Sequence, residues 1–237
     1  MLHTQPLTTV QAQRLRAYLA AAAAATNEPD APTPLAEAPT IDALVAHPGV
    51  SADLLNGLDV AVAALLHAGA TLKQLGELGY GARHLARTPA VASQLVGKFG
   101  STSTAVAVLR NPQDAVDLSG SHLAVKTLRV STKTLLEACQ GDRASAIEVV
   151  RRLMAHDAEE RAALDPNGKG APSGIAQLRA KLRVGVLHGV GVATLARLGL
   201  DGAQLYTHFG ISIDDLASAL GVDVKDLEPL GVYERGQ

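Results

Sequence analysis

Apolar residues recur at a regular spacing in the last fifty residues of the chain. There a large apolar residue followed by glycine appears every ten or eleven residues, at Leu198-Gly199, Phe209-Gly210, Leu220-Gly221 and Leu230-Gly231. Two residues after each of the first three glycines stands a residue that can cap a helix, and six residues after it stands a leucine. The capping residues are Asp201, Ser212 and Asp223, and the leucines are Leu205, Leu216 and Leu227.

Each position in this unit has a physical role. Asp or Ser can accept a hydrogen bond from a free backbone N–H and so start a helix. The leucine four residues later faces inward on the next turn, and glycine adopts the left-handed conformation of a C-terminal cap. The pattern therefore predicts helices of about two turns that start at Asp201, Ser212 and Asp223 and end before Gly210 and Gly221. Because such helices are too short to be stable alone, neighbouring units must share a core.

The same pattern occurs earlier in the chain. Three glycines there precede a leucine by six residues, namely Gly49 before Leu55, Gly69 before Leu75 and Gly79 before Leu85. Ser131 and Leu135 keep the cap and the leucine, but Arg129 stands where the glycine would be. No segment shows a sustained alternation of apolar and polar residues. The sequence therefore predicts an all-α fold of short stacked helices with glycine-terminated 10–11-residue units.

Prolines, glycines and longer helical stretches divide the chain into segments. Four prolines predict an extended arm with few contacts to the core, and the stretch DPNGKGAPSG is the clearest internal break. The predicted segments are an N-terminal helix at 1–26, a Pro-rich arm at 27–40, a first helical half at 41–130, longer central helices at 131–164, a loop at 165–174 and a C-terminal helical half at 175–237.

The two helical halves share a short similarity. Residues 56–64 align with residues 188–196 so that Gly57, Val60, Ala61 and Ala64 match Gly189, Val192, Ala193 and Ala196. Alanine-rich helices also match by chance at this level, so two related halves and two unrelated halves both stay open.

The segment LHGVGVATLARL, Leu187–Leu198, has an apolar-x-Gly-apolar-Gly turn before a predicted helix, and in this it resembles the helix-hairpin-helix motif. The resemblance implies a first helix at Gln177–Leu187 and a second at Val192–Leu198, with Ala193, Ala196 and Leu198 packing inward. In that family the N–H groups of the hairpin hold a DNA phosphate without reading sequence. The phosphate contacts that the resemblance implies are Gly189, Gly191, Val192, Arg179, Arg183 and Arg197.

Two features separate this segment from the family pattern. Val192 and Thr194 stand directly after the hairpin, where the family often has Lys or Arg, and the similar earlier segment has Asp59 at the position of the second glycine. A carboxylate there would repel phosphate. We therefore prefer the simpler interpretation, in which Gly189 and Gly191 let two helices turn and pack closely, with neighbouring helices covering the N–H groups of the hairpin.

Composition favours neither catalysis nor a general affinity for nucleic acid or membranes. The formal net charge is −2 and the pI is about 6.4, so no global field attracts polyanions. No apolar run approaches the roughly 18 residues of a membrane span. Cys139 is the only cysteine, and the eight histidines form no metal-binding motif. The sequence has no nucleophile elbow and no complete phosphate loop. We predict no catalytic residues, no metal and no cofactor.

These patterns favour a soluble, intracellular protein that is not secreted and that works as a non-enzymatic structural or protein-interaction component of a larger assembly. Its partners would be other proteins or further copies of the same chain. The alternative is a helix-hairpin-helix protein that binds the DNA backbone.

Overall fold

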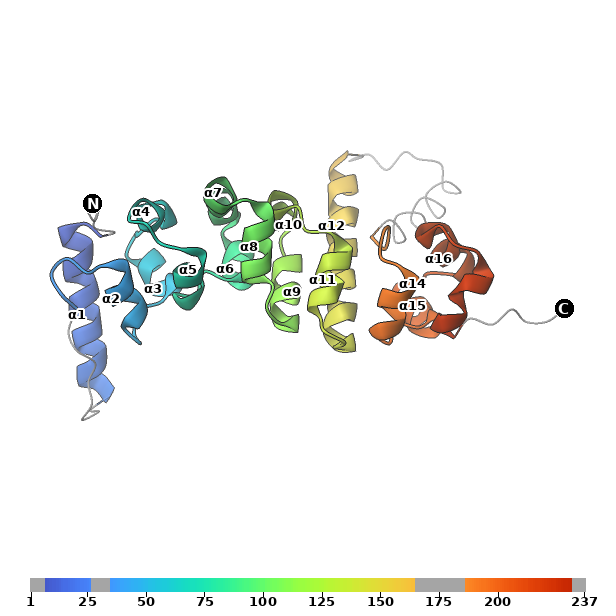
Figure 1. The fold of residues 1–237 in the computed structure, drawn as a ribbon, viewed down its shortest axis with the longest axis horizontal. Helices are drawn as coiled ribbons and strands as arrows, with labels where there is room; N and C mark the ends of the chain where they lie inside the picture. The colour runs from blue at the N-terminus through green and yellow to red at the C-terminus, as the bar shows by residue number, and fades with distance from the viewer. Residues whose placement is uncertain (1–6, 27–34, 165–185, 232–237) are drawn as a thin grey trace. The chain divides into compact units, whose positions relative to one another are not determined.

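The computed structural model describes residues 7–26, 35–164 and 186–231. In these ranges every regular element is helical (Figure 1), which confirms the predicted all-α fold. None of the helices in the described ranges is long and apolar enough to cross a membrane. The chain divides into two compact units, Met1–Val108 and Leu109–Gln237, and each is described here by itself.

The first unit begins with one long helix, which is followed by five helices of six residues and two somewhat longer ones. Its elements are α1 (Thr9–Thr26), α2 (Ile41–Ala46), α3 (Ala52–Gly57), α4 (Val62–His67), α5 (Leu72–Glu77), α6 (Ala82–Arg87), α7 (Pro89–Phe99) and α8 (Ser101–Val108).

Helices α2 to α6 form a regular array with a repeat of ten or eleven residues. The side chains of Thr40, Ser51 and Thr71 accept hydrogen bonds from the backbone N–H three residues later, which starts the helices they precede. The residue four positions after each cap is a leucine with no exposed surface. These leucines are Leu44, Leu55, Leu65, Leu75 and Leu85. The predicted inward leucine is thus the shared core of the array.

One unit of this array was missed in the sequence. In the unit that contains α4, Ala61 stands at the cap position and Asp59 stands where the other units have glycine. Leu65 is nevertheless buried, like the corresponding leucines of the neighbouring units. Asp59 adopts a left-handed φ of 56°, and the N–H of Val60 donates to the carbonyl of Leu55 at 2.9 Å. Gly69 and Gly79 close their units by the same bond pattern. The backbone turn, rather than the glycine itself, defines the repeat.

The predicted arm is described only from residue 35 onward, and residues 27–34 lie outside the described ranges. Residues 35–40 contain no helix, as predicted. Leu35 and Pro39 are nevertheless buried, so the prediction of few core contacts is wrong for this end of the arm. An apolar side chain next to an open core gains free energy by filling it, whatever the backbone conformation.

In its described residues the second unit contains four helices up to residue 164 and four short elements from residue 186 onward. They are α9 (Pro112–Ser119), α10 (His122–Leu128), α11 (Thr132–Ala138) and α12 (Arg143–Leu164), followed by α14 (Val192–Arg197), α15 (Gly202–Phe209), α16 (Ile213–Leu220) and the 3-10 helix η1 (Val224–Leu230). The predicted loop at 165–174 lies outside the described residues.

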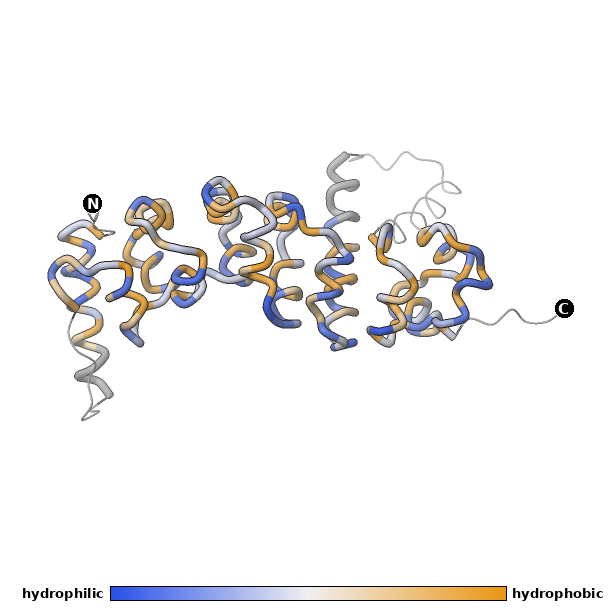
Figure 2. The backbone as a smooth tube through the Cα atoms, viewed as in Figure 1, coloured by the Kyte–Doolittle hydropathy of each residue, from blue (hydrophilic) through white to orange (hydrophobic). Residues whose placement is uncertain are grey.

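The predicted helix starts at Asp201, Ser212 and Asp223 are confirmed, since each is the N-cap of its element. Gly210 and Gly221 are left-handed C-caps, as predicted. The last element is a 3-10 helix with Pro229 inside it; proline has no N–H to donate to an α-helical bond. In Figure 2 apolar and polar residues alternate along these short elements, which accords with helices buried on one side.

The unit before Ser131 ends in a left-handed turn although it has no glycine. Arg129 is left-handed, with φ of 53°, and Val130 donates its N–H to the carbonyl of Val125 at 3.1 Å. The unit is therefore closed in the same way as the glycine-containing ones.

The division between the two units falls inside the segment 41–130, which the sequence analysis treated as one half. Helix α9 packs against α10, α11 and α12. Residues from Leu109 onward therefore share a core with the longer central helices rather than belonging to a separate half.

Candidate functional site

The hairpin is a tight turn with an apolar inner side and a glycine outer side. Residues 186–189 form the turn, and Gly189 has a left-handed φ of 78°. Leu187 and Val190 are fully buried, and the N–H of Val190 donates to the carbonyl of Leu187 at 3.0 Å. Gly191 then acts as N-cap of α14, where its carbonyl accepts the N–H of Thr194 at 3.0 Å. The buried side chains of Leu187 and Val190 therefore hold the turn in place.

The two glycines of the hairpin face open space. Both are exposed, and a Cβ atom added to Gly189 or Gly191 would meet nothing within 4 Å. Within the described residues no neighbouring side chain covers the α-carbons of these glycines, and the covering of the hairpin N–H groups stays a prediction. The glycines lie outside because Leu187 and Val190 occupy the inward positions on either side of Gly189.

The inward face of α14 differs from the one that the motif resemblance implied. Leu198 is buried as expected, but Ala193 is exposed and Ala196 is only half-buried. Thr194 and Leu195 are buried in their place. Leu195 stands four residues after the cap Gly191, which is the position of the buried Leu205, Leu216 and Leu227 in the units that follow. The repeat register therefore decides which side of α14 packs inward.

Of the three cations that the resemblance implied, the structure describes only Arg197. Arg179 and Arg183 lie outside the described residues. Arg197 is exposed at the C-terminal end of α14, about 9 Å along the helix axis from Gly191 and Val192. It lines an open recess of about 390 Å³ together with Glu137, Gln140 and Gly141. A carboxylate in the same recess makes it a poor place for phosphate.

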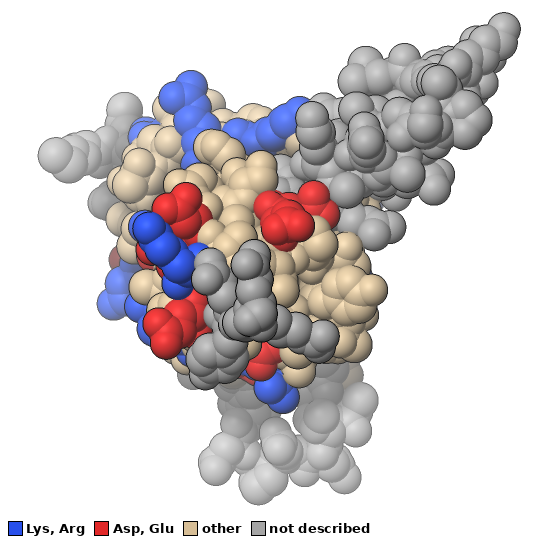
Figure 3. All heavy atoms as spheres, turned by 90° about the vertical axis from the view of Figure 1, so that its right-hand side faces the viewer, with Lys and Arg blue, Asp and Glu red and all other residues tan. Residues whose placement is uncertain are grey.

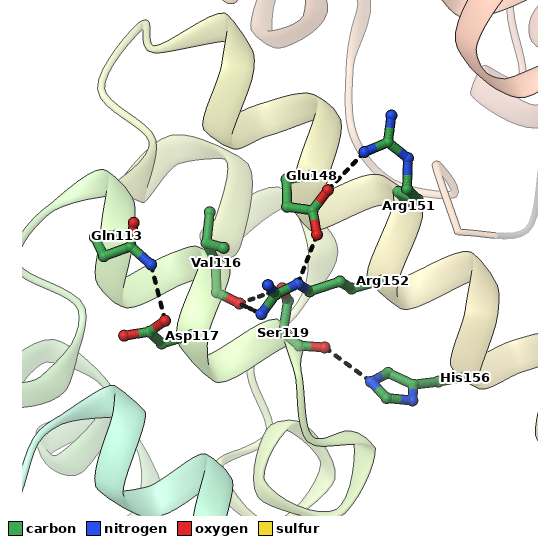
Figure 4. Close-up of polar contacts among 8 residues, drawn as sticks. All are labelled: Gln113, Val116, Asp117, Ser119, Glu148, Arg151, Arg152 and His156. Atoms are coloured by element: carbon green, nitrogen blue, oxygen red, sulfur yellow. Dashed lines mark hydrogen bonds and ion pairs between the residues drawn. The ribbon is translucent and has the colours of Figure 1, made fainter.

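The most extensive polar contacts in the second unit tie α12 to the end of α9 (Figure 4). Arg152 donates from Nη1 to the carbonyl of Val116 at 2.9 Å and from Nε to Glu148 at 2.8 Å. The imidazole of His156 lies 2.9 Å from the carbonyl of Ser119. Hydrogen bonding by Arg152 lowers the pKa of Glu148. These groups satisfy carbonyls at a helix C-terminus, and this accounts for their polar chemistry in structural terms.

A second polar cluster, missed in the sequence analysis, is buried in the first unit. The ring centroids of Tyr80 and His84 lie 4.7 Å apart in a T-shaped arrangement, and Nε2 of His84 lies 3.2 Å from Nδ2 of Asn56. The Tyr80 hydroxyl is buried without a hydrogen-bond partner in the described part of the chain. Burial raises the pKa of Tyr80 to about 12 and lowers that of His84. Tyr80 could have indicated this cluster in the sequence, because it occupies the repeat position that Val50, Val60 and Ala70 occupy in the other units.

Within the described ranges, no three His, Cys, Asp or Glu side chains lie close enough to bind a metal ion together. Cys139 is buried, and burial raises the pKa of its thiol to about 11. Its sulfur lies 3.4 Å from the carbonyl of Leu135, one helical turn earlier. It therefore packs as a small apolar side chain.

Large apolar side chains are exposed on helices of both units. None of them takes part in the clusters described above. They are Val10 (56% exposed), Tyr18 (55%), Val106 (72%), Leu123 (61%), Tyr206 (67%) and Ile213 (44%). Full burial of one such side chain contributes about 1.5–3 kcal/mol, so they are the described groups best suited to contact another macromolecule.

Comparison with known proteins adds no relative from which a function could be carried over. No protein-family model matches the chain, no curated protein matches it, and no solved structure matches it.

Proposed function

We propose that this protein is a non-enzymatic, intracellular component of a macromolecular assembly, and that its short helices form a scaffold for contacts with other proteins or with further copies of the chain. The observation that carries the proposal is the set of exposed apolar side chains on helices, of which Val106, Tyr206 and Leu123 are the most exposed. Single exposed apolar residues are normal on protein surfaces; here they occur on helices of both units, beside polar clusters that are occupied in packing.

The polar clusters of the described residues are occupied in packing. Arg152 and His156 contact carbonyls at the end of α9, and His84 is buried between Tyr80 and Asn56. These packing contacts give each of these residues a structural role that requires no substrate. A scaffold needs only a stable surface, which short helices that share a core within each unit provide.

One observation favours the alternative, in which the hairpin binds the DNA backbone. Gly189 and Gly191 are exposed, with open space around them, so a phosphate could reach the turn. The position of Arg197 at the far end of α14, beside Glu137, argues against it.

Two measurements test these proposals. The native protein, purified gently from its source and sized by chromatography, should elute with a larger assembly; elution as a free monomer under all gentle conditions would contradict the scaffold proposal. A mobility shift with duplex DNA at low salt tests the alternative, because binding to phosphates must weaken steeply as salt rises. Salt-sensitive DNA binding that a Gly191→Asp variant loses while staying folded would replace the scaffold proposal with the alternative.

A further inference from the structure

Helix α1 packs on the array with one face and leaves an apolar face open. Ala12 and Leu15 are buried, and Leu19 lies so close to Gly49 that an added Cβ there would come within 2.7 Å of its side chain. Gln11 donates from Nε2 to the carbonyl of Asp59 at 3.0 Å. These contacts fix the orientation of α1 on the first unit.

The opposite face of α1 carries residues at the spacing i, i+4, i+7 and i+11, which lie on one side of a helix. They are Val10, Arg14, Ala17 and Ala21, all exposed. Tyr18 is exposed beside them. The outer face of a terminal element in a repeat array is usually polar. Here it combines apolar side chains with the cation Arg14, and residues 7–26 contain no acid.

The C-terminal elements present a surface of opposite charge. Tyr206 on α15 and Ile213 at the start of α16 are exposed, and Asp214 is exposed next to Ile213. Residues 186–231 contain six carboxylates and two cations, which gives a net charge of −4. On the face that Figure 3 turns to the viewer, Asp and Glu side chains stand among uncharged ones, with Lys and Arg side chains beside them and at the edges.

We infer that the α1 face of one copy binds the α15–α16 face of a second copy, in a head-to-tail contact. The α1 face is defined by Val10, Arg14, Ala17 and Tyr18, and the α15–α16 face by Tyr206, Ile213 and Asp214. Each surface pairs a tyrosine and a β-branched residue with one sign of charge, and every chain carries both surfaces. This inference rests on the proposed scaffold function and names a second copy as the partner.

The contact is heterologous, because the two surfaces are different, so each bound copy leaves one surface free for the next. A few large side chains on each surface bury less than the roughly 800 Å² per partner of a standard interface. We therefore expect weak association, with a dissociation constant on the order of micromolar or above. It should weaken as salt rises, because exposed charges are screened.

The test uses sedimentation velocity of the full chain with one variant for each face and one matched control for each variant. Val10→Asp disrupts the α1 face, and Val106→Asp makes the same change at an exposed valine elsewhere in the first unit. Tyr206→Lys disrupts the α15–α16 face, and Leu123→Lys places the same charge on α10. Circular dichroism and melting temperatures should match the wild type for all four, because every site is exposed.

The wild type and both controls should associate as concentration rises, while Val10→Asp and Tyr206→Lys alone stay monomeric. A mixture of these two variants should form a complex of two chains and no larger one, because each supplies the surface that the other lacks. A wild type that stays monomeric at all concentrations would overturn the inference. So would a mixture without a complex, or association lost in only one of the two variants, which indicates a symmetric contact. If the native protein still elutes with a larger assembly while the pure chain stays monomeric, the inference fails and the scaffold proposal stands.

Discussion

The left-handed glycines that close the repeats predict opposite effects for the same substitution at two sites of the first unit. Gly69 ends a unit with φ of 93°, whereas Gly97 lies inside α7. An added Cβ meets nothing within 4 Å at either site. Steric contact is therefore absent from both substitutions, and only the backbone conformation distinguishes Gly69→Ala from Gly97→Ala.

The magnitudes follow from the backbone. A non-glycine residue in a left-handed conformation costs about 1–2 kcal/mol, while replacing glycine by alanine stabilises by about 0.4–1 kcal/mol through the unfolded chain. Gly69→Ala should therefore lower the free energy of unfolding by about 1 kcal/mol. Gly97→Ala should raise it by about 0.5–1 kcal/mol, because glycine inside a helix is unfavourable. For a unit of this size, 1 kcal/mol corresponds to a Tm shift of about 4–8 °C.

Thermal and urea unfolding followed by circular dichroism measure both variants against the wild type. The expected result is a lower Tm for Gly69→Ala and a higher Tm for Gly97→Ala. If both variants shift the Tm in the same direction, the left-handed turn does not carry the stability of the repeat, and the reasoning is refuted.

Three other sites give further predictions. Leu65→Ala should destabilise the first unit by about 3–5 kcal/mol, because Leu65 is fully buried; urea unfolding measures this loss, and an effect below 1 kcal/mol would show that the missed repeat is not part of the core. Burial lowers the pKa of His84 below 6.5. The contribution of neutral His84 to the free energy of unfolding should therefore be fully present above pH 6.5 and decrease as the pH falls toward the folded-state pKa. A His84→Gln variant should lose this part of the pH dependence, and an unchanged slope of stability against pH would contradict the prediction. Gly191→Asp should change the Tm little, because Gly191 is exposed in open space; marked destabilisation would mean that the hairpin is covered after all.

Local sequence patterns specify where the short helices of the repeats begin and end. Asp201 and Ser212 start helices, and Gly210 ends one, where the pattern predicted. These features depend on hydrogen bonds between residues at most six positions apart, such as the bond from the N–H of Gln204 to Asp201. A cap and a turn need only the right residues in the right order, so neither depends on the rest of the fold.

Where local signals were weak, the packing of the unit decided the structure. Asp59 and Arg129 adopt the left-handed conformation although neither is glycine. The buried residues Leu55 and Leu65 on either side of Asp59 hold that turn in place. Their burial offsets a backbone cost of about 1–2 kcal/mol, and this gain does not appear in the residue types of the turn itself.

Only the tertiary structure decided which surfaces are open. The sequence could not show that Gly191 and Ala193 face outward, that Leu195 packs inward, or that the boundary between the units follows Val108. Exposure depends on which neighbours cover a residue, and these neighbours come from distant parts of the chain, as when Arg152 reaches the carbonyl of Val116. Local hydrogen bonds therefore specify the helices, while long-range packing specifies the surfaces they present.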